Sequence, residues 1–260
     1  MDPIPELSGG WRDWGRTVAA VVAATFAVGT VLSVLDGLNI TTPEPIFASD
    51  SKLPDRILAV LQNQSERFPW VLAAALVAAL GFAAIAALAP VLRRALSATE
   101  WRASVITGGL VIGAAIGILA ELGFIGGQIV ASDPTYCQCD FADIQLIARA
   151  GLLDLVSTVQ TWLLAGFLGL VGAGLFAAAG AARRSAAVPR GWTTLTTVLA
   201  VLMVAIAVWI AGFPLLANAL RLQVDVDTIT AIPSLVVLLV LMPWWALWLR
   251  SWLGRPAPLS

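Results

Sequence analysis

Six long apolar stretches constrain this chain more than any other feature. An α-helix rises 1.5 Å per residue, so roughly 20 apolar residues are needed to cross a hydrocarbon core of ~30 Å. The stretches that meet this length are 17–35, 70–92, 103–130, 155–182, 193–217 and 229–250. Backbone groups in a bilayer must be hydrogen-bonded within the protein, which favours helices. We therefore predict an all-α fold, a polytopic membrane helical bundle with six transmembrane helices, as a single integral membrane domain over 1–260.

The composition supports this prediction and excludes several classes of protein. The chain is 59% hydrophobic and 12% charged, whereas soluble domains are about 45–50% apolar and about 25% charged. A water-soluble globule, a disordered chain and a nucleic-acid-binding protein are thereby excluded, and the lipid bilayer is the expected partner. The chain has no His and two Cys. Histidine-ligated haem or zinc, a Ser-His-Asp triad and a four-thiolate metal site are therefore excluded. We expect no cofactor, no metal and no enzyme activity.

The distribution of charge predicts the orientation. Every second connection is rich in arginine, and cytoplasmic connections of membrane proteins carry an excess of Lys and Arg. Ten of the fifteen basic residues fall in segments on one side, with four acids, while the opposite segments hold eleven acids. These ten are Arg12, Arg16, Arg93, Arg94, Arg102, Arg183, Arg184, Arg190, Arg250 and Arg255. Both termini are therefore predicted to be cytoplasmic.

The longest predicted outer connection is the loop 36–69, which contains a short amphipathic helix near 54–66. Ile57, Leu58 and Leu61 share one side of that helix, and charged residues share another. An amphipathic helix of this kind lies on the membrane surface or packs over the mouth of the bundle. Both alternatives remain open at this point.

Small residues predict where helices pack closely. Gly109, Gly113 and Gly117 are spaced by four, which places them on one face of the third stretch. Glycine on such a face allows a second helix to approach closely. Because the fourth stretch is also rich in Gly and Ala, we expect the third and fourth helices to form a tight hairpin. A homo-oligomer formed through the same stripe is the alternative.

The last stretch contains two prolines and lies near a group of tryptophans. Pro233 suits the start of a helix, whereas Pro243 lies in its interior and is expected to kink it, because proline removes a helical hydrogen bond. Amphipathic tryptophan rings favour the headgroup level of a membrane. We therefore interpret the tryptophans as an aromatic belt; they are Trp11, Trp14, Trp101, Trp192, Trp244, Trp245, Trp248 and Trp252.

Glu121 is the charged residue that most needs an explanation, because it lies inside the third stretch. A carboxylate in the hydrocarbon core costs at least ~2.5–3.5 kcal/mol, so it must be protonated, paired or exposed to water. Gln128 follows seven residues later on the same helix face. Arg149, Asp154 and Gln160 belong to the next outer connection and the outer half of the fourth stretch. These five residues form either an ion or proton site or, through a pair of Arg149 with Glu121 or Asp154, a structural contact.

Cys137 and Cys139 form a Cys-x-Cys sequence in the predicted outer loop between the third and fourth stretches. We consider a strained disulfide ring or free thiols first, and a redox-active pair or a bridge to a partner second. A thiolate metal site with Asp133 or Asp140 comes last, because two thiols without His are a weak metal motif.

The chain resembles uncharacterised six-span membrane proteins of actinobacteria. The resemblance depends on the pairs Arg93–Arg94 and Arg183–Arg184, the sequence at 188–192, and the tryptophan-rich tail at 243–254. It implies a helical bundle with no assigned chemistry. The dominance of Arg over Lys fits a bacterial genome, so the expected location is the bacterial inner (cytoplasmic) membrane, with multiple passes.

Two functions remain compatible with these features. The first is a structural, regulatory or partner subunit of the membrane, which the absence of catalytic and nucleotide-binding motifs favours. The alternative is a small ion or solute transporter or channel that uses Glu121, because ionisable residues inside a membrane often mark transport pathways. The membrane partner of such a subunit is either a second copy of the chain or another membrane protein.

Overall fold

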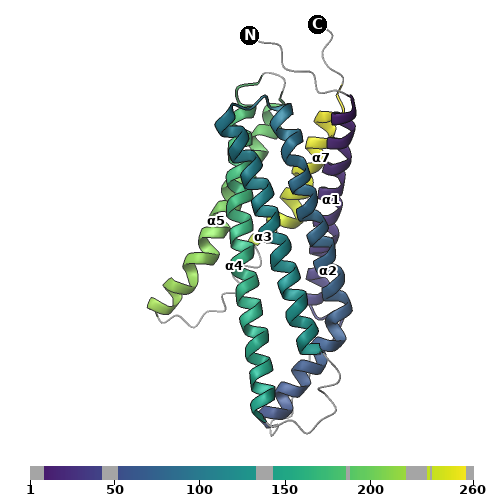
Figure 1. Ribbon diagram of the computed structural model, residues 1–260, viewed down its shortest axis with the longest axis vertical. Helices are drawn as coiled ribbons and strands as arrows, with labels where there is room; N and C mark the ends of the chain where they lie inside the picture. Colours follow the sequence, from purple (N-terminus) through teal and green to yellow (C-terminus); the bar gives the residue numbers. More distant parts are fainter. Residues whose placement is uncertain are drawn as a thin grey trace.

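The fold is a bundle of long helices. The structure is a computed structural model. It describes residues 9–42, 52–132, 143–185, 188–220, 233–234 and 236–255. Within these ranges it is helical and contains no strand (Figure 1). The helices are α1 (Gly9–Gly37), α2 (Leu53–Ala95), α3 (Glu100–Ser132), α4 (Asp143–Ala182), α5 (Arg190–Leu220), the π-helical segment η2 (Val236–Leu241) and α7 (Met242–Leu253).

Six helical segments of the described chain are long and apolar enough to cross a membrane, the last of them being Val236–Leu253. The fold class predicted from the sequence is thereby confirmed. Segments of this length and hydropathy place the protein in contact with a lipid bilayer. The protein is a multi-pass membrane protein.

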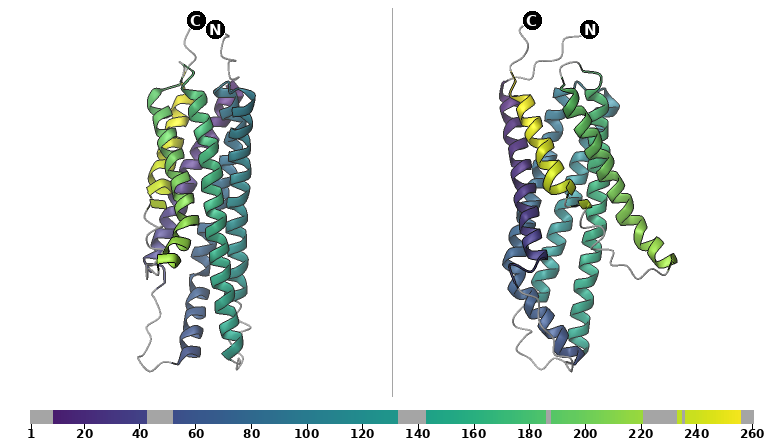
Figure 2. Two further views of the ribbon diagram at one scale, coloured as in Figure 1. Left: turned by 90° about the vertical axis from the view of Figure 1, so that its left-hand side faces the viewer. Right: turned by 180° about the vertical axis from the view of Figure 1, so that it is seen from behind.

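Consecutive helices pack side by side, and the last helix returns to the first. α1 packs on α2, α2 on α3, α3 on α4, and α4 on α5, while α7 lies along α1. At one end of the bundle, Arg12 at the start of α1 donates from Nη1 to the Arg255 carbonyl oxygen at 3.3 Å. α5 diverges from the other helices toward its far end, and α7 covers only the half of the bundle near the chain termini (Figure 2). The far part of the bundle therefore consists mainly of α2, α3 and α4.

Aromatic side chains close the middle of the bundle. Phe82 in α2 lies between Phe26 in α1 and Phe167 in α4, with ring centroids 5.8 and 4.5 Å away. A Cβ added at Gly117 in α3 would lie 2.8 Å from the Phe82 ring. Four helices thus meet around Phe82, which leaves no room for a side chain at Gly117.

The predicted helix near 54–66 exists, but it is the first part of α2 and not a separate surface helix. Pro69 lies inside α2 without ending it. The 43 residues of α2 extend over about 65 Å at 1.5 Å per residue, which is twice the thickness of a hydrocarbon core. Leu61 is buried there, in contact with Leu153 of α4. Of the two alternatives, packing of the segment against the bundle is the one observed, because α4 covers its apolar side.

The end of the chain changes helix type where Pro243 lies. The π-helical segment Val236–Leu241 precedes α7, which begins at Met242 with Pro243 in its first turn. A wider π turn accommodates a residue that cannot donate a backbone hydrogen bond. The predicted disturbance at Pro243 thus takes the form of a π-helical turn followed by a new α-helix start.

Two of the tryptophans assigned to a lipid-facing belt instead lie in the protein interior. Trp192 and Trp245 are fully buried and stacked, with ring centroids 6.1 Å apart. Trp245 donates from Nε1 to the Thr196 hydroxyl at 2.9 Å. Trp244 is 53% exposed and matches the belt interpretation. The buried pair joins α5 to α7. The hydropathy pattern alone does not distinguish buried tryptophans of this kind from tryptophans that face the membrane surface.

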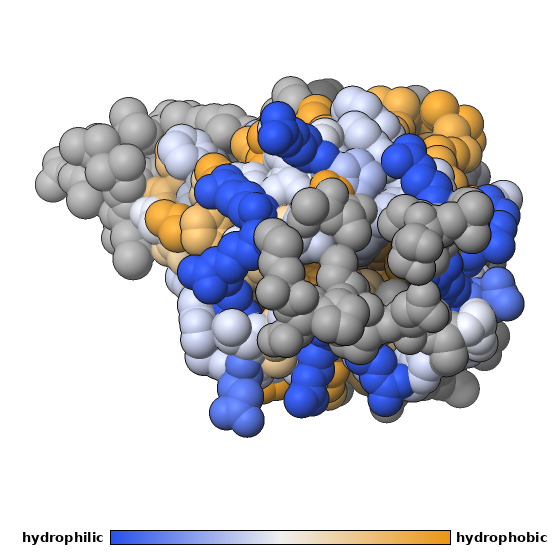
Figure 3. Space-filling model, turned by 90° about the horizontal axis from the view of Figure 1, so that it is seen from above, coloured by the Kyte–Doolittle hydropathy of each residue, from blue (hydrophilic) through white to orange (hydrophobic). Residues whose placement is uncertain are grey.

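The arginines that the sequence assigned to one side do lie at one end. They occur at the start of α1, α3 and α5 and at the end of α2, α4 and α7. Hydrophilic side chains surround this end, at which α1 begins and α7 ends (Figure 3). We call it the arginine end. The end of α3 and the starts of α2 and α4 lie at the opposite end.

Candidate functional site

A cavity of about 610 Å³ lies at the end opposite the arginine end. Its walls come from the first part of α2, the last part of α3 and the first part of α4, where these helices extend beyond α7 (Figure 2). We call it the outer cavity. It combines charged and polar side chains with an apolar wall. The polar residues are Asp36, Arg56, Gln64, Arg67, Gln128, Asp154 and Ser157.

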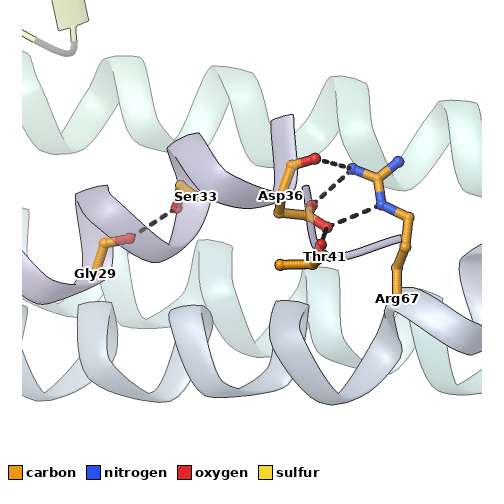
Figure 4. Close-up of polar contacts among 5 residues, drawn as sticks. All are labelled: Gly29, Ser33, Asp36, Thr41 and Arg67. Atoms are coloured by element: carbon orange, nitrogen blue, oxygen red, sulfur yellow. Dashed lines mark hydrogen bonds and ion pairs between the residues drawn. The ribbon is translucent and has the colours of Figure 1, made fainter. Parts of the chain in front are cut away.

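An ion pair between α1 and α2 forms one edge of the outer cavity (Figure 4). Arg67 donates from Nε to Asp36 Oδ1 at 2.9 Å and from Nη2 to Asp36 Oδ2 at 2.7 Å. Its Nη2 also reaches the Asp36 carbonyl oxygen at 3.3 Å. The Thr41 hydroxyl donates to Asp36 Oδ1 at 3.1 Å. This arrangement fixes the last turn of α1 against α2, and no pattern in the sequence predicted it.

Gln128 is the cavity residue whose hydrogen bonding is incomplete. It is 5% exposed, and its Oε1 has no hydrogen-bond partner within the described chain. Phe124, one turn earlier on the same face of α3, also lines the cavity. A buried amide oxygen without a donor costs free energy unless a ligand or water supplies one. Gln128 thus lines the outer cavity and carries a buried acceptor that no described residue satisfies.

The register between α3 and α4 determines which predicted site residues meet. A Cβ at Gly109 would lie 2.8 Å from the Gly174 backbone, and one at Gly127 would lie 2.6 Å from Val156. This antiparallel register sets Glu121 level with Trp162. Arg149 is thirteen residues further along α4, which is about 20 Å at 1.5 Å per residue. The structure therefore does not bring Glu121 and Arg149 together.

Glu121 lies deeper than the outer cavity. It is 8% exposed, and no hydrogen bond or ion pair to its carboxylate is present among the described residues. Helical spacing puts it on the side of α3 that carries Gly117, which faces Phe82 of α2. Gln128 is seven residues away, or about 10 Å along the helix axis. Glu121 does not line the outer cavity.

The remaining predicted residues divide between the outer cavity and the rest of the bundle. Asp154 is exposed and lines the cavity together with Gln128. Gln160 is half-buried on α4 and does not line it. Arg149 is half-buried next to the cavity residue Ala150. Of the five candidates, the structure thus brings together Gln128 and Asp154.

The glycine stripe contacts two different helices. A Cβ at Gly109 would lie 2.6 Å from the Leu170 carbonyl oxygen, and one at Gly113 would lie 2.8 Å from the Val171 side chain. Both glycines thus face α4. Gly117 instead faces Phe82 of α2. The stripe permits α3 to pack closely against two neighbours at once.

Cys137 and Cys139 lie outside the described residues. Within the residues that the structure describes, no three His, Cys, Asp or Glu side chains gather to hold a metal ion.

The chain was compared with family models, curated proteins and solved structures. No family model, no curated protein and no solved structure matches this chain. The fold and the outer cavity define a helical multi-pass membrane protein with a polar cavity at one end.

Proposed function

We propose that the protein is a non-enzymatic structural or regulatory partner subunit of a bacterial cytoplasmic membrane, which holds a second polypeptide at the outer cavity. The observation that carries this proposal is Gln128, which lines the outer cavity and whose buried Oε1 has no hydrogen-bond donor among the described residues. A hydrogen-bond donor from a partner would satisfy it. Arg56 and Asp154 add charges of both signs to the lining, which suits a polar segment of a partner.

The orientation follows from the arginine end. Ten basic residues lie there, and the positive-inside tendency assigns such an end to the cytoplasm. Both termini are then cytoplasmic, and the outer cavity opens to the outside of the cell membrane. A partner at this cavity is a membrane protein with an external segment, or an external protein.

The packing beneath the outer cavity favours binding over transport. Phe82 contacts Phe26 and Phe167, and Gly117 has no room for a Cβ beside the Phe82 ring. A solute that entered the cavity would meet this closed layer. A partner subunit needs a stable recognition surface and no path through the bundle.

The test is to extract the protein with its surrounding membrane in polymer-bounded lipid discs and measure the mass and composition of the particle. The wild type is expected to carry a second polypeptide at fixed stoichiometry. Gln128→Leu removes the amide and is expected to lose that polypeptide. Gln160→Leu makes the same change outside the cavity and is expected to retain it. A wild-type particle that contains this chain alone contradicts the proposal, as does retention of the polypeptide by Gln128→Leu.

A second candidate is a small ion or solute transporter or channel that uses Glu121. It is favoured by the buried carboxyl of Glu121, which has no partner in the described chain. Intramembrane ionisable groups are costly and commonly functional. Proton flux into liposomes separates the two candidates, with Glu121→Gln compared against Glu100→Gln, an exposed residue at the start of α3. Flux that Glu121→Gln abolishes and Glu100→Gln preserves supports transport; flux equal to that of protein-free liposomes supports the partner subunit.

A further inference from the structure

A second cavity, of about 670 Å³, lies at the arginine end, where α4 ends and α5 begins. Arg183, Arg184 and Arg190 line it, together with threonine hydroxyls from the first turns of α5. Arg183 donates from Nη2 to the Thr197 hydroxyl at 3.3 Å. This cavity is separate from the outer cavity, and the proposed function does not use it.

An apolar cavity of about 660 Å³ lies further along α4 and α5 from the arginine end, and exposed side chains such as Phe176 and Val201 line it. Its floor is the small-residue face of α4, including Ala177 and Gly180, and valines of α5 form one wall. Arg102 of α3 also lines it. The Arg102 guanidinium carbon is 3.8 Å from the position of a Cβ on Gly180 and 5.0 Å from the Trp101 ring centroid. Because Gly180 has no side chain, Arg102 can lie across α4 at this level.

The cavity at the arginine end and the apolar cavity follow one another along α4 and α5. We call them together the groove between α4 and α5, with a basic part and an apolar part. On α4, Gly180 in the apolar part is followed three residues later by Arg183 in the basic part, and such residues share a helix face. On α5, Thr197 in the basic part is followed four residues later by Val201 in the apolar part. Along α5, from Arg190 to Ala205, the groove extends over about 20 Å.

The charge in this groove has one sign. Four arginines line it, and none of the described residues that line its two parts is acidic. Guanidinium groups match phosphate oxygens in geometry and charge, and basic pockets between membrane helices bind anionic headgroups. The apolar part begins directly below these arginines. A ligand that fits both parts carries a phosphate at one end and hydrocarbon at the other.

We infer that the groove between α4 and α5 binds one anionic phospholipid, with its phosphate among Arg102, Arg183 and Arg190 and an acyl chain over Gly180 and Val201. The length of the groove is comparable to one leaflet of a bilayer, since the full hydrocarbon core is ~30 Å thick. An inorganic anion would leave the apolar part empty, and a zwitterionic lipid would leave the arginines without a matching net charge.

The wild-type protein provides the first test. It is delipidated in detergent, then titrated with phosphatidylglycerol, phosphatidylcholine or inorganic phosphate, and bound lipid is counted by native mass spectrometry. One phosphatidylglycerol is expected to bind in preference to phosphatidylcholine, and excess phosphate is expected not to displace it. Equal binding of the two lipids overturns the inference, because the arginines then make no selection. Displacement by phosphate also overturns it, because the acyl chain then contributes nothing.

Matched variants locate the bound lipid. Arg183→Gln and Arg190→Gln are each expected to weaken phosphatidylglycerol binding about fivefold, the effect typical of one basic residue at a membrane surface. Arg93→Gln removes the same charge from an exposed position outside the groove and is expected to leave binding unchanged. Val201→Trp fills the apolar part and is expected to weaken binding of the lipid, while Val208→Trp, outside the groove and 65% exposed, is not. Equal effects of groove and control variants overturn the inference.

Discussion

Arg67 in α2 binds both carboxylate oxygens of Asp36 in α1, through Nε at 2.9 Å and Nη2 at 2.7 Å. The two side chains are 20% and 16% exposed, so the pair is largely shielded from solvent. This contact joins the last turn of α1 to the outer part of α2 and forms an edge of the outer cavity. The shape of the cavity therefore depends on it.

Asp36→Asn is expected to lower the free energy of unfolding by about 1.5–3 kcal/mol, since hydrogen bonds to charged groups contribute this much. Thermal unfolding in detergent measures the effect. The double variant with Arg67→Gln is expected to be less destabilised than the sum of the two single variants, because the residues are in direct contact. Asp13→Asn is the control: Asp13 is 77% exposed and 3.7 Å from Arg16, and its loss is expected to cost under ~1 kcal/mol. Strict additivity of Asp36→Asn and Arg67→Gln would argue against the pair.

Gly109→Ala is expected to destabilise the bundle by about 1–3 kcal/mol, the usual cost of overpacking. The added Cβ would lie 2.6 Å from the Leu170 carbonyl oxygen, a backbone atom that moves only if α4 moves. Gly108→Ala meets nothing within 4 Å and is expected to be neutral or stabilising, because alanine favours helix over glycine. Thermal unfolding of the two variants in the same detergent makes the comparison. Equal stabilities would contradict the observed packing of α3 on α4.

Glu121→Gln is expected to leave the stability unchanged or to increase it. Glu121 is buried without a partner in the described chain, and an amide of the same shape carries no charge to desolvate. The unfolding temperature in detergent measures this effect. A loss of more than ~1 kcal/mol would show that the carboxylate makes a stabilising contact.

Gln128→Leu is expected to leave the isolated protein at least as stable as the wild type, while it removes the bound partner. Its Oε1 has no hydrogen-bond partner in the described chain, and replacing such a group by an apolar one of similar size is close to neutral or favourable. Unfolding temperature and partner retention are measured on the same preparations. A large loss of stability would instead assign Gln128 a structural role.

Thr196→Val is expected to cost about 1–3 kcal/mol, because it leaves the buried Trp245 Nε1 without its acceptor. Thr194→Val makes the same substitution at an exposed position of α5 and is expected to change stability by less than ~0.5 kcal/mol. Thermal unfolding followed by tryptophan fluorescence compares the two variants. The prediction fails if the exposed and buried positions respond equally.

The six helices follow from the sequence because a bilayer imposes length and hydropathy on every segment that crosses it. The even number of crossings also places the start of α1 and the end of α7 at the same end, where Arg12 reaches Arg255. The extension of α2 does not follow from the sequence. The apolar side of 54–66 suits lipid or protein equally, and only the position of Leu153 shows that α4 covers it.

The candidate site was predicted in part. The seven-residue spacing places Gln128 and Glu121 on the same face of α3. They lie at different depths along the helix, and only Gln128 lines the outer cavity. Distances between helices depend on the register, which the contacts of Gly109 and Gly127 reveal and the sequence does not. Asp36 and Arg67 are 31 residues apart, on either side of a turn, and no periodic pattern connects them.

The sidedness of the two ends in intact cells tests the proposed orientation and function most directly. A membrane-impermeant maleimide is applied to two single-cysteine variants, Gln62→Cys near the outer cavity and Ser185→Cys at the arginine end, with Cys137 and Cys139 replaced by serine. We expect the cysteine at position 62 to be labelled in intact cells and the cysteine at 185 to be labelled only after the membrane is opened. The reverse pattern would place the outer cavity in the cytoplasm and contradict the proposed function.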